Sequence, residues 1–398
     1  MNPVLALGVT QVLGYGSLYY AFPILVPGVA ATFGRPEAHL YAVFSAGLLV
    51  GGFAAPWAGR LMDRIGAARL MSLGSLLAAA CLALVGSAPV FPLWAAGIVL
   101  TEIVAVAVLY DAAFAALAQL RGAGARRAIT RLTLIAGFAS TVFWPLTDAL
   151  ASAHGWRATL FAYAALHLTL GAGLHAVLAR RRPAVADAHV PSAGRPVLEA
   201  PELPAALVPA AFRAVAISFA LSGALISAFG VHMVPVLAAS GLGGQATLAA
   251  MLVGPAQVGV RLVDAVFLAR LHPLTVAAIS ASALPLAAAG LVLGLPVWIA
   301  GILFAGLFGV GQGLASIVRG SVPLALFGRV GYGARLGRLT MVRTVLSAGA
   351  PVLFAWGGAQ IGWNATLSLF ALLGVAATAP LLLLRARLAS GGHLAPLR

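Results

Sequence analysis

Long apolar segments recur along almost the whole chain, and this pattern constrains the fold more than any other feature. Each segment has about 20 residues or more, the length that an α-helix needs to cross the roughly 30 Å hydrocarbon core of a bilayer. Of the 398 residues, 62% are hydrophobic and only 8% are charged, whereas soluble domains carry about 25% charged residues. Lipid offers no partners for unpaired backbone groups, so open strands are excluded. The sequence predicts an all-α polytopic membrane protein.

We predict twelve transmembrane helices in two groups of six, which form domains over 1–180 and 211–388. A proline-rich cytoplasmic linker is expected over 181–210, and a cytoplasmic tail over 389–398. The first apolar segment is too long for a signal peptide and lacks a basic leader. The predicted helices cover about 4–31, 40–58, 70–87, 92–120, 129–151, 157–179, 211–238, 247–269, 274–293, 297–325, 339–360 and 363–384.

The basic residues predict the orientation of these helices. All 24 are arginine, and only Arg35 and Arg157 fall in segments predicted to lie outside, so both termini should be cytoplasmic. The net charge of +15 then faces anionic lipid and does not indicate nucleic-acid binding. We expect a functional monomer in a bacterial cytoplasmic (inner) membrane.

The residue types argue against enzymatic chemistry. The single cysteine, Cys81, excludes an internal disulfide. The chain has no phosphate-binding loop and no metal-ligand spacing, so no cofactor or metal is expected. Energy for any transport should therefore come from an ion gradient, and we expect no enzyme activity.

An internal repeat appears at a fixed offset of 207 residues. Gly155-Trp156-Arg157-Ala158-Thr159-Leu160 corresponds to Gly362-Trp363-Asn364-Ala365-Thr366-Leu367, and Phe22 corresponds to Phe229. Six helices per copy give both copies the same orientation, which predicts parallel repeats. Such repeats commonly hold substrate near the membrane midplane and expose it to each side in turn.

The segment between the second and third predicted helices carries a recognisable motif. Gly59-Arg60-Leu61-Met62-Asp63-Arg64-Ile65-Gly66-Ala67-Ala68-Arg69 resembles the signature loop of the major facilitator superfamily. The resemblance implies a secondary active transporter with the major facilitator fold. It also implies a gating role for this loop, carried by Gly59, Asp63, Arg64, Gly66 and Arg69; the alternative is a tight basic loop that only sets topology.

A weaker resemblance links the segment Gly14 to Pro23 with the monocarboxylate and oxalate/formate branch of that superfamily. The branch implies a cation in the eighth helix that holds a substrate carboxylate, a place that Arg261 fits. It also implies a second cation in the eleventh helix, for which Arg343 is the candidate, although Arg343 is predicted to lie only about one turn inside the cytoplasmic end.

Arg261 is the leading candidate for binding substrate, because a charge inside the membrane needs a partner, water or a purpose. Asp264 lies three residues further on the same helix face, and Gln257 lies four residues before it. Asp264 is either a structural partner or a counter-ion that releases the arginine to a substrate anion. An alternative alignment with Arg60-Leu61-Met62-Asp63 would move Arg261 to the membrane edge, but it breaks the 207-residue offset.

Two carboxylates in the fourth predicted helix are candidates for carrying a coupling proton. A carboxyl group inside the membrane is protonated more easily than one in water, which makes Glu102, Asp111 and Asp264 the proton-coupling candidates. In one continuous helix, Glu102 and Asp111 would point to opposite faces, since they are nine residues apart. A purely structural pairing, for Asp111 with Arg64, is the alternative.

The remaining candidates for lining a substrate cavity are polar or aromatic residues inside predicted helices. Aromatic side chains at such places often serve packing alone. The candidates are Gln11, Tyr15, Tyr19, Gln312 and Trp144.

These features predict a transporter for a small organic anion, coupled to protons. Efflux of amphipathic drugs or toxic compounds is a second hypothesis, since aromatic residues are expected to line the cavity. A membrane receptor that binds without transporting is a third. The expected partners are a small-molecule substrate, a proton and membrane lipid.

Overall fold

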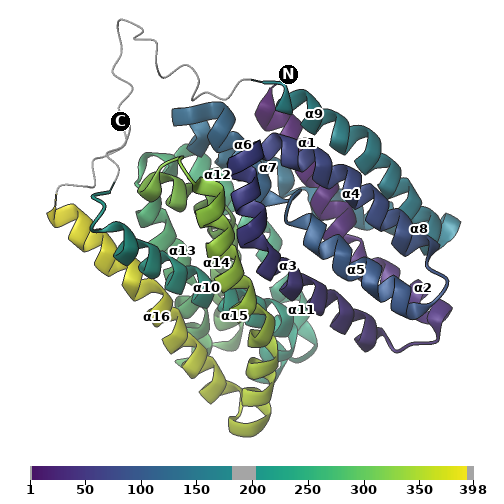
Figure 1. Cartoon of the computed structure of the whole chain (residues 1–398). Helices are drawn as coiled ribbons and strands as arrows, with labels where there is room; N and C mark the ends of the chain where they lie inside the picture. Colours follow the sequence, from purple (N-terminus) through teal and green to yellow (C-terminus); the bar gives the residue numbers. More distant parts are fainter. Residues whose placement is uncertain (1, 182–202, 392–398) are drawn as a thin grey trace, which may run out of the picture. The chain divides into compact units, whose positions relative to one another are not determined.

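The computed structural model describes residues 2–181 and 203–391. The chain divides into two compact units (Figure 1). Unit 1 comprises Met1–Val197 and Arg329–Met341, and unit 2 comprises Leu198–Gly328 and Val342–Arg398. No strand occurs in the described residues, so the predicted all-α fold is confirmed. Most of the predicted linker and tail lies outside the described residues.

Unit 1 is a bundle in which most predicted helices are interrupted. Two of its short segments, η1 and η3, are π-helical, and η2 is a 3-10 turn. The start of α15 (Tyr332–Ile361) also belongs to this unit. In chain order, the remaining segments are α1 (Pro3–Tyr15), η1 (Gly16–Tyr20), α2 (Phe22–Phe33), α3 (Glu37–Ile65), α4 (Ala67–Ser87), α5 (Phe91–Ala105), α6 (Tyr110–Arg121), η2 (Gly122–Gly124), α7 (Ala125–Ala136), α8 (Ala139–Leu166), η3 (His167–Gly171) and α9 (Ala172–Ala179).

Unit 2 contains longer uninterrupted helices, and the rest of α15 belongs to it. Its segments are α10 (Val208–Leu237), η5 (Ala238–Leu242), η6 (Gly243–Gln245), α11 (Ala246–Ala250), α12 (Val253–Val266), η7 (Leu268–Arg270), α13 (Pro273–Val292), α14 (Val297–Phe327), the later part of α15, and α16 (Trp363–Ser390).

Ten stretches of the described chain are long and apolar enough to cross a membrane. The number is two fewer than the twelve predicted spans, for two reasons. The spans predicted over 129–151 and 157–179 lie in one 55-residue stretch, Ala125–Ala179, which turns sharply at Gly155. The span predicted over 247–269 is interrupted between α11 and α12, and α12 has only 14 residues.

The same glycine turn occurs once in each unit, at the positions that the repeat pairs. Gly155 has φ 78° and ψ 166°, and Gly362 has φ 81° and ψ 160°. Thr159 and Thr366 each donate a hydrogen bond of 2.9 Å to the carbonyl oxygen of the glycine four residues before. This backbone region is almost closed to residues with a side chain, so glycine is required at both turns.

Each unit packs around a phenylalanine that the repeat also pairs. Phe22 stacks on Phe44 at 4.2 Å between ring centroids, and Phe229 lies 5.3 Å from Phe304 and 5.6 Å from Phe354. Lipid is as apolar as these rings, so the stabilisation comes from close packing of atoms and not from escape from water.

Two predictions in unit 1 differ from the structure, one about the continuity of a helix and one about where a helix ends. The helix predicted over 92–120 breaks between Ala105 and Tyr110, and the Gln11 amide donates a 2.8 Å hydrogen bond to the freed carbonyl of Val108. The signature motif is not an extended loop, because α3 continues through Asp63 to Ile65. The chain turns only at Gly66, where φ is 91°.

Candidate functional site

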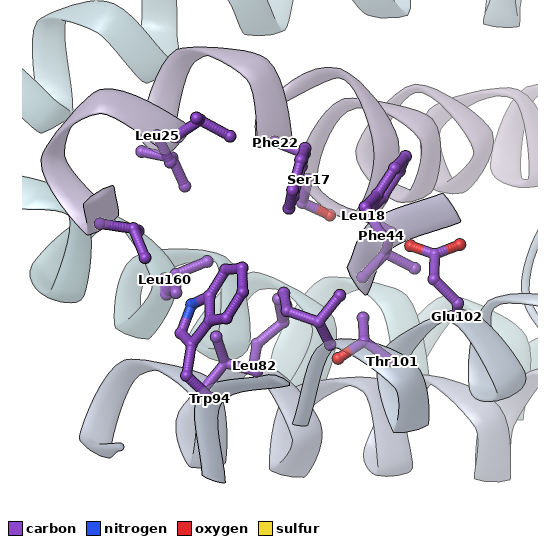
Figure 2. Close-up of a pocket in the computed structure, with 14 residues that line it drawn as sticks. Ser17, Leu18, Phe22, Leu25, Phe44, Leu82, Trp94, Thr101, Glu102 and Leu160 are labelled. Atoms are coloured by element: carbon purple, nitrogen blue, oxygen red, sulfur yellow. The ribbon is translucent and has the colours of Figure 1, made fainter. Parts of the chain in front are cut away.

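Unit 1 encloses a cavity of about 30 Å³ between its helices (Figure 2). The wall is mainly apolar, and Ser17, Thr101 and Glu102 supply its polar groups. Leu25, Trp94 and Leu160 surround one end of the cavity, while Glu102 lies at the other end. A space of this volume holds water molecules but no organic substrate. The cavity is therefore suited to hydrating a carboxyl group.

Glu102 reaches the cavity from α5 with 5% of its surface exposed. Two glycines of α3 leave room for it: a Cβ atom on Gly47 would lie 3.0 Å from the Glu102 Cγ, and one on Gly51 would lie 2.8 Å from its backbone oxygen. Within the described residues, no hydrogen bond or ion pair holds the Glu102 carboxyl group. Packing alone fixes its position beside the cavity.

Asp111 has different surroundings from Glu102. It lies in the first turn of α6, after the break that separates α5 from α6. Its Oδ2 atom accepts a 2.6 Å hydrogen bond from the hydroxyl of Thr340, which also belongs to unit 1. The prediction that these two carboxylates share one continuous helix is wrong, although the prediction that they face different surroundings agrees with the structure.

Asp63 of the signature motif caps a helix start. Its two carboxylate oxygens accept hydrogen bonds from the backbone amides of Gly333 (2.9 Å) and Ala334 (2.8 Å). These amides belong to the first turn of α15, where donors have no partner within the helix and a negative charge is favoured. Gly59 permits the contact, because a Cβ atom there would collide with the Gly333 backbone.

The turn at Gly66 is held by a residue that the sequence did not indicate. Gln119 of α6 accepts a hydrogen bond from the Ala67 amide (2.8 Å) and donates one to the Met62 carbonyl (3.1 Å). Arg64 and Arg69, two of the three arginines of the motif, are exposed on either side of this turn.

In unit 2, three predicted site residues come together between α12 and α14. The Gln257 side chain donates to that of Gln312, and the Arg261 Nε donates to the Gly313 carbonyl at 3.4 Å. Arg261 is 8% exposed, and Asp264 is buried one turn further along α12. The result is a buried polar cluster with a guanidinium group between two mainly apolar helices.

Arg343 lies deeper in its helix than predicted, because α15 begins at Tyr332 and places it about 16 Å along the axis. Its side chain and the Ser347 hydroxyl pack against Gly223 of α10, where an added Cβ atom would approach them to 2.6 and 2.7 Å. The hydroxyl groups of Ser218, Ser222 and Ser347 are buried, with no hydrogen-bond partner in the described part of unit 2.

The other predicted lining residues do not border the cavity of unit 1. Gln11 is buried and its amide donates a hydrogen bond to the Val108 carbonyl. Tyr15 packs on Tyr110 with ring centroids 4.6 Å apart. Tyr19 is 41% exposed and Trp144 is 52% exposed.

Sequence reasoning missed two buried histidines near the cavity. The His167 Nε2 lies 2.8 Å from the Ser17 Oγ, and the two ring nitrogens of His175 lie 3.0 Å from the Ser75 Oγ and 2.9 Å from the Thr10 Oγ1. The signal is present in the sequence, since both histidines stand in apolar segments.

Comparison with known proteins places this architecture in a family. The family model described as Major Facilitator Superfamily matches residues 7–317. The chain belongs to the Major Facilitator Superfamily. This membership identifies an integral membrane transporter and points away from an enzyme. The match does not single out the monocarboxylate branch, and no curated protein matches the sequence.

Solved structures of other Major Facilitator Superfamily proteins are similar in fold. The human organic anion transporter MFSD10 (TETRAN) is 18% identical with a TM-score of 0.67, and the match covers 96% of this chain and 100% of that one. FucP in the outward conformation is 15% identical with a TM-score of 0.65, over 96% and 99% of the two chains. The proton:xylose symporter XylE is 12% identical with a TM-score of 0.64, over 94% of each.

Proposed function

We propose that this transporter moves a small organic anion through a bacterial cytoplasmic membrane by alternating access, and that it couples this movement to protons. Arg261 binds the carboxylate or similar group of the substrate, and Glu102 carries the coupling proton. Both termini lie in the cytoplasm, and the protein works as a monomer.

The polar cluster around Arg261 is the observation that carries the anion assignment. A guanidinium group offers several donors in one plane and matches a carboxylate with two parallel hydrogen bonds. Gln257 and Gln312 bond to each other beside it, which supplies neutral donors that would orient an anion. Arg343, with the serine hydroxyls of α10 and α15, offers a second cationic place in the same unit.

The proton assignment is supported by the cavity beside Glu102. The carboxyl group lies next to a space large enough for water molecules, and in this proposal it exchanges protons through water without direct contact with the substrate. Asp111 is engaged by Thr340 and Asp264 lies beside Arg261, so both serve structural or counter-ion roles in this proposal. Among the solved relatives, one is an organic anion transporter and another is a proton:xylose symporter.

A latch role for Asp63 completes the proposal. Its hydrogen bonds to the first turn of α15 stabilise the conformation described here. The transport cycle would break and remake these two bonds.

The test begins with binding, because the substrate is unidentified. Purified protein is screened by thermal stability against monocarboxylates, dicarboxylates and, as neutral compounds, hexoses. We expect stabilisation by a carboxylate, and Arg261→Ala should remove it, while Arg270→Ala, at an exposed arginine of the same unit, should keep it.

Uptake of the carboxylate that binds is then measured in proteoliposomes. The Arg261→Ala variant should lose at least about 90% of the uptake rate, as expected for loss of a charge-assisted contact worth about 1.5–3 kcal/mol. If hexoses alone stabilise the protein, or if Arg261→Ala transports the carboxylate normally, the anion assignment fails.

A further inference from the structure

Five buried polar side chains form a row inside unit 1, and none of them is a predicted site residue. The row consists of Ser17 on η1, His167 on η3, Ser75 on α4, His175 on α9 and Thr10 on α1. We call it the serine–histidine track. It starts at the cavity that Glu102 also borders, since Ser17 lines that cavity.

The hydrogen bonds of Ser17 favour one placement of the proton on His167. When the Ser17 hydroxyl donates to the Leu13 carbonyl at 2.7 Å, it accepts from the His167 Nε2 at 2.8 Å. The neutral His167 ring then has a bare lone pair on Nδ1. This atom is buried and has no hydrogen-bond partner in the described residues. His167, which is 1% exposed, therefore holds a vacant proton acceptor inside the bundle.

His175 has partners that suit both of its protonation states. Thr10 donates to the Leu7 carbonyl at 3.1 Å and accepts from the His175 Nε2. The His175 Nδ1 lies 3.0 Å from the Ser75 hydroxyl and 3.2 Å from the Met71 carbonyl. A neutral ring accepts at Nδ1 from Ser75, and a protonated ring donates there to the Met71 carbonyl. His175 thus takes up a proton without moving.

The two histidine sites meet at Gly171, the last residue of η3. A Cβ atom on Gly171 would lie 3.2 Å from the Ser75 Oγ and 3.6 Å from the His167 Nδ1. Both atoms therefore border the space that a side chain at Gly171 would fill. They do not hydrogen-bond to each other directly, because the His167 Nδ1 has no partner in the described residues, so one bridging water molecule would connect them.

The helix geometry supports a functional role for this contact. Ser17 and His167 lie on the two π-helical segments of the described chain in unit 1, η1 and η3. Single π-turns inside α-helices are rare and frequently mark functional sites. Here they widen both helices where the serine and the imidazole ring meet.

In the described part of unit 1, no charged side chain outside the track forms a hydrogen bond with any of its five residues. Arg69 lies in the first turn of α4. Asp148, His154 and Arg157 lie in α8, ten or more residues before His167. Tyr163 hydrogen-bonds to Thr147, and Cys81 lies further along α4. Glu102, across the cavity from Ser17, is the nearest carboxyl group that the cavity connects to the track.

We infer that the serine–histidine track is the route by which protons reach and leave Glu102. His175 lies about 6 Å along α9 from the helix end at Ala179, so this end of the track is close to the surface of the unit. The α1 and α9 helices run beside each other there (Figure 1). The inference rests on the proposed coupling role of Glu102, and it adds the path by which this role is fulfilled.

The transfer is balanced at every step. A proton on His175 Nδ1 passes through the Ser75 hydroxyl and a bridging water molecule to His167 Nδ1, and His167 releases the proton on its Nε2 to Ser17. Ser17 passes a proton through water in the cavity to the Glu102 carboxylate. Each group gains one proton and loses one, and the hydroxyl groups and rings then return to their starting orientation.

The experiment follows the proton on Glu102 directly and needs no substrate. Purified protein in lipid vesicles is transferred to D₂O, and infrared spectroscopy records the carbonyl stretch of protonated carboxyl groups. The band that Glu102→Gln removes belongs to Glu102. Its shift upon deuteration should slow by about tenfold or more in His167→Gln, since glutamine can hydrogen-bond to Ser17 but cannot relay a proton.

A glycine pair provides the matched control. Gly171→Ala places a methyl group between Ser75 and His167, and it should slow the exchange as His167→Gln does. Gly173→Ala, two residues away on α9, points into open space and should leave the exchange rate unchanged. Thermal stability identifies any variant that has lost its fold.

The outcomes separate the two proposals. Normal exchange in folded His167→Gln and Gly171→Ala overturns the track, while Glu102 keeps its proposed role. A wild-type spectrum without any band sensitive to Glu102→Gln overturns the coupling role of Glu102, and the track then has no acceptor to serve.

Discussion

At the residue scale, the surroundings of Glu102 separate its possible roles. No cation or hydrogen-bond donor in the described residues holds its carboxyl group, and the cavity beside it admits water. Gly47 packs against the side chain, and Gly51 packs against the backbone of the same residue. A residue held by shape alone keeps its place whether it is charged or neutral, which is what a proton carrier requires.

Substitution of Glu102 by glutamine should therefore uncouple transport from protons. Glutamine has nearly the same shape but cannot release a proton. We expect Glu102→Gln to lose accumulation driven by a pH gradient and to retain exchange of substrate across the membrane. Both are measured in proteoliposomes with the carboxylate that stabilises the protein.

The exposed Glu37 in the first turn of α3 provides the control. Glu37→Gln should keep both activities. If accumulation driven by the gradient persists in Glu102→Gln, another group carries the proton.

The sequence showed the charged candidates but not their neighbours. Arg261 and Glu102 stand out because charges are rare in apolar segments. Their partners depend on helix register, which the pattern of apolar residues does not determine. The contact between Ser17 and His167 also depends on two π-turns, which widen helices without a proline.

At the element scale, the helix breaks were the least predictable feature. The break before α6 falls in Val106-Ala107-Val108-Leu109, which contains neither glycine nor proline. It is stabilised instead by Gln11, 97 residues away along the chain. The opposite error occurred at α3, where the charged end of the helix was read as a loop.

The hydrogen bonds of Asp63 predict a local effect on α15. Asp63→Asn removes the negative charge and one of the two acceptor oxygens, so the first turn of α15 should open more often. We expect a loss of about 1 kcal/mol in the free energy of unfolding. Hydrogen exchange at the Gly333 and Ala334 amides should accelerate severalfold.

Asp148→Asn serves as the comparison, because Asp148 is also an exposed aspartate in unit 1. It should leave these amides unchanged. Equal exchange in wild type and Asp63→Asn would show that the cap does not hold the helix start.

At the scale of the whole molecule, the 207-residue offset predicted the duplication, and the paired turns at Gly155 and Gly362 agree with it. The two copies differ where function is proposed. The partners of Ser17, His167 and His175 in the second copy are Ala224, Gly374 and Leu382. The serine–histidine track therefore belongs to one copy only, as does Glu102, whose partner is Gly309.

The duplication predicts equal effects of one substitution at two distant places. Alanine at Gly155 or Gly362 meets no atom within 4 Å, so its cost is backbone strain alone, about 1–3 kcal/mol. We expect both variants to lose this amount in the free energy of unfolding, measured by denaturing detergent titration in mixed micelles.

Gly349→Ala is the matched control, because this glycine also faces open space but has an ordinary helical backbone. It should be neutral, or more stable by up to about 1 kcal/mol. Unequal losses at Gly155 and Gly362 would contradict the equivalence of the two turns.

The paired turns also have a genetic consequence. Every amino acid that a single base change can produce from a glycine codon carries a Cβ atom, and the backbone at Gly155 and Gly362 excludes it. Each single-base change that replaces either glycine is thus selected against, whereas apolar residues in the flanking helices exchange freely for one another. These two glycine codons therefore preserve evidence of the duplication after most other paired positions have diverged.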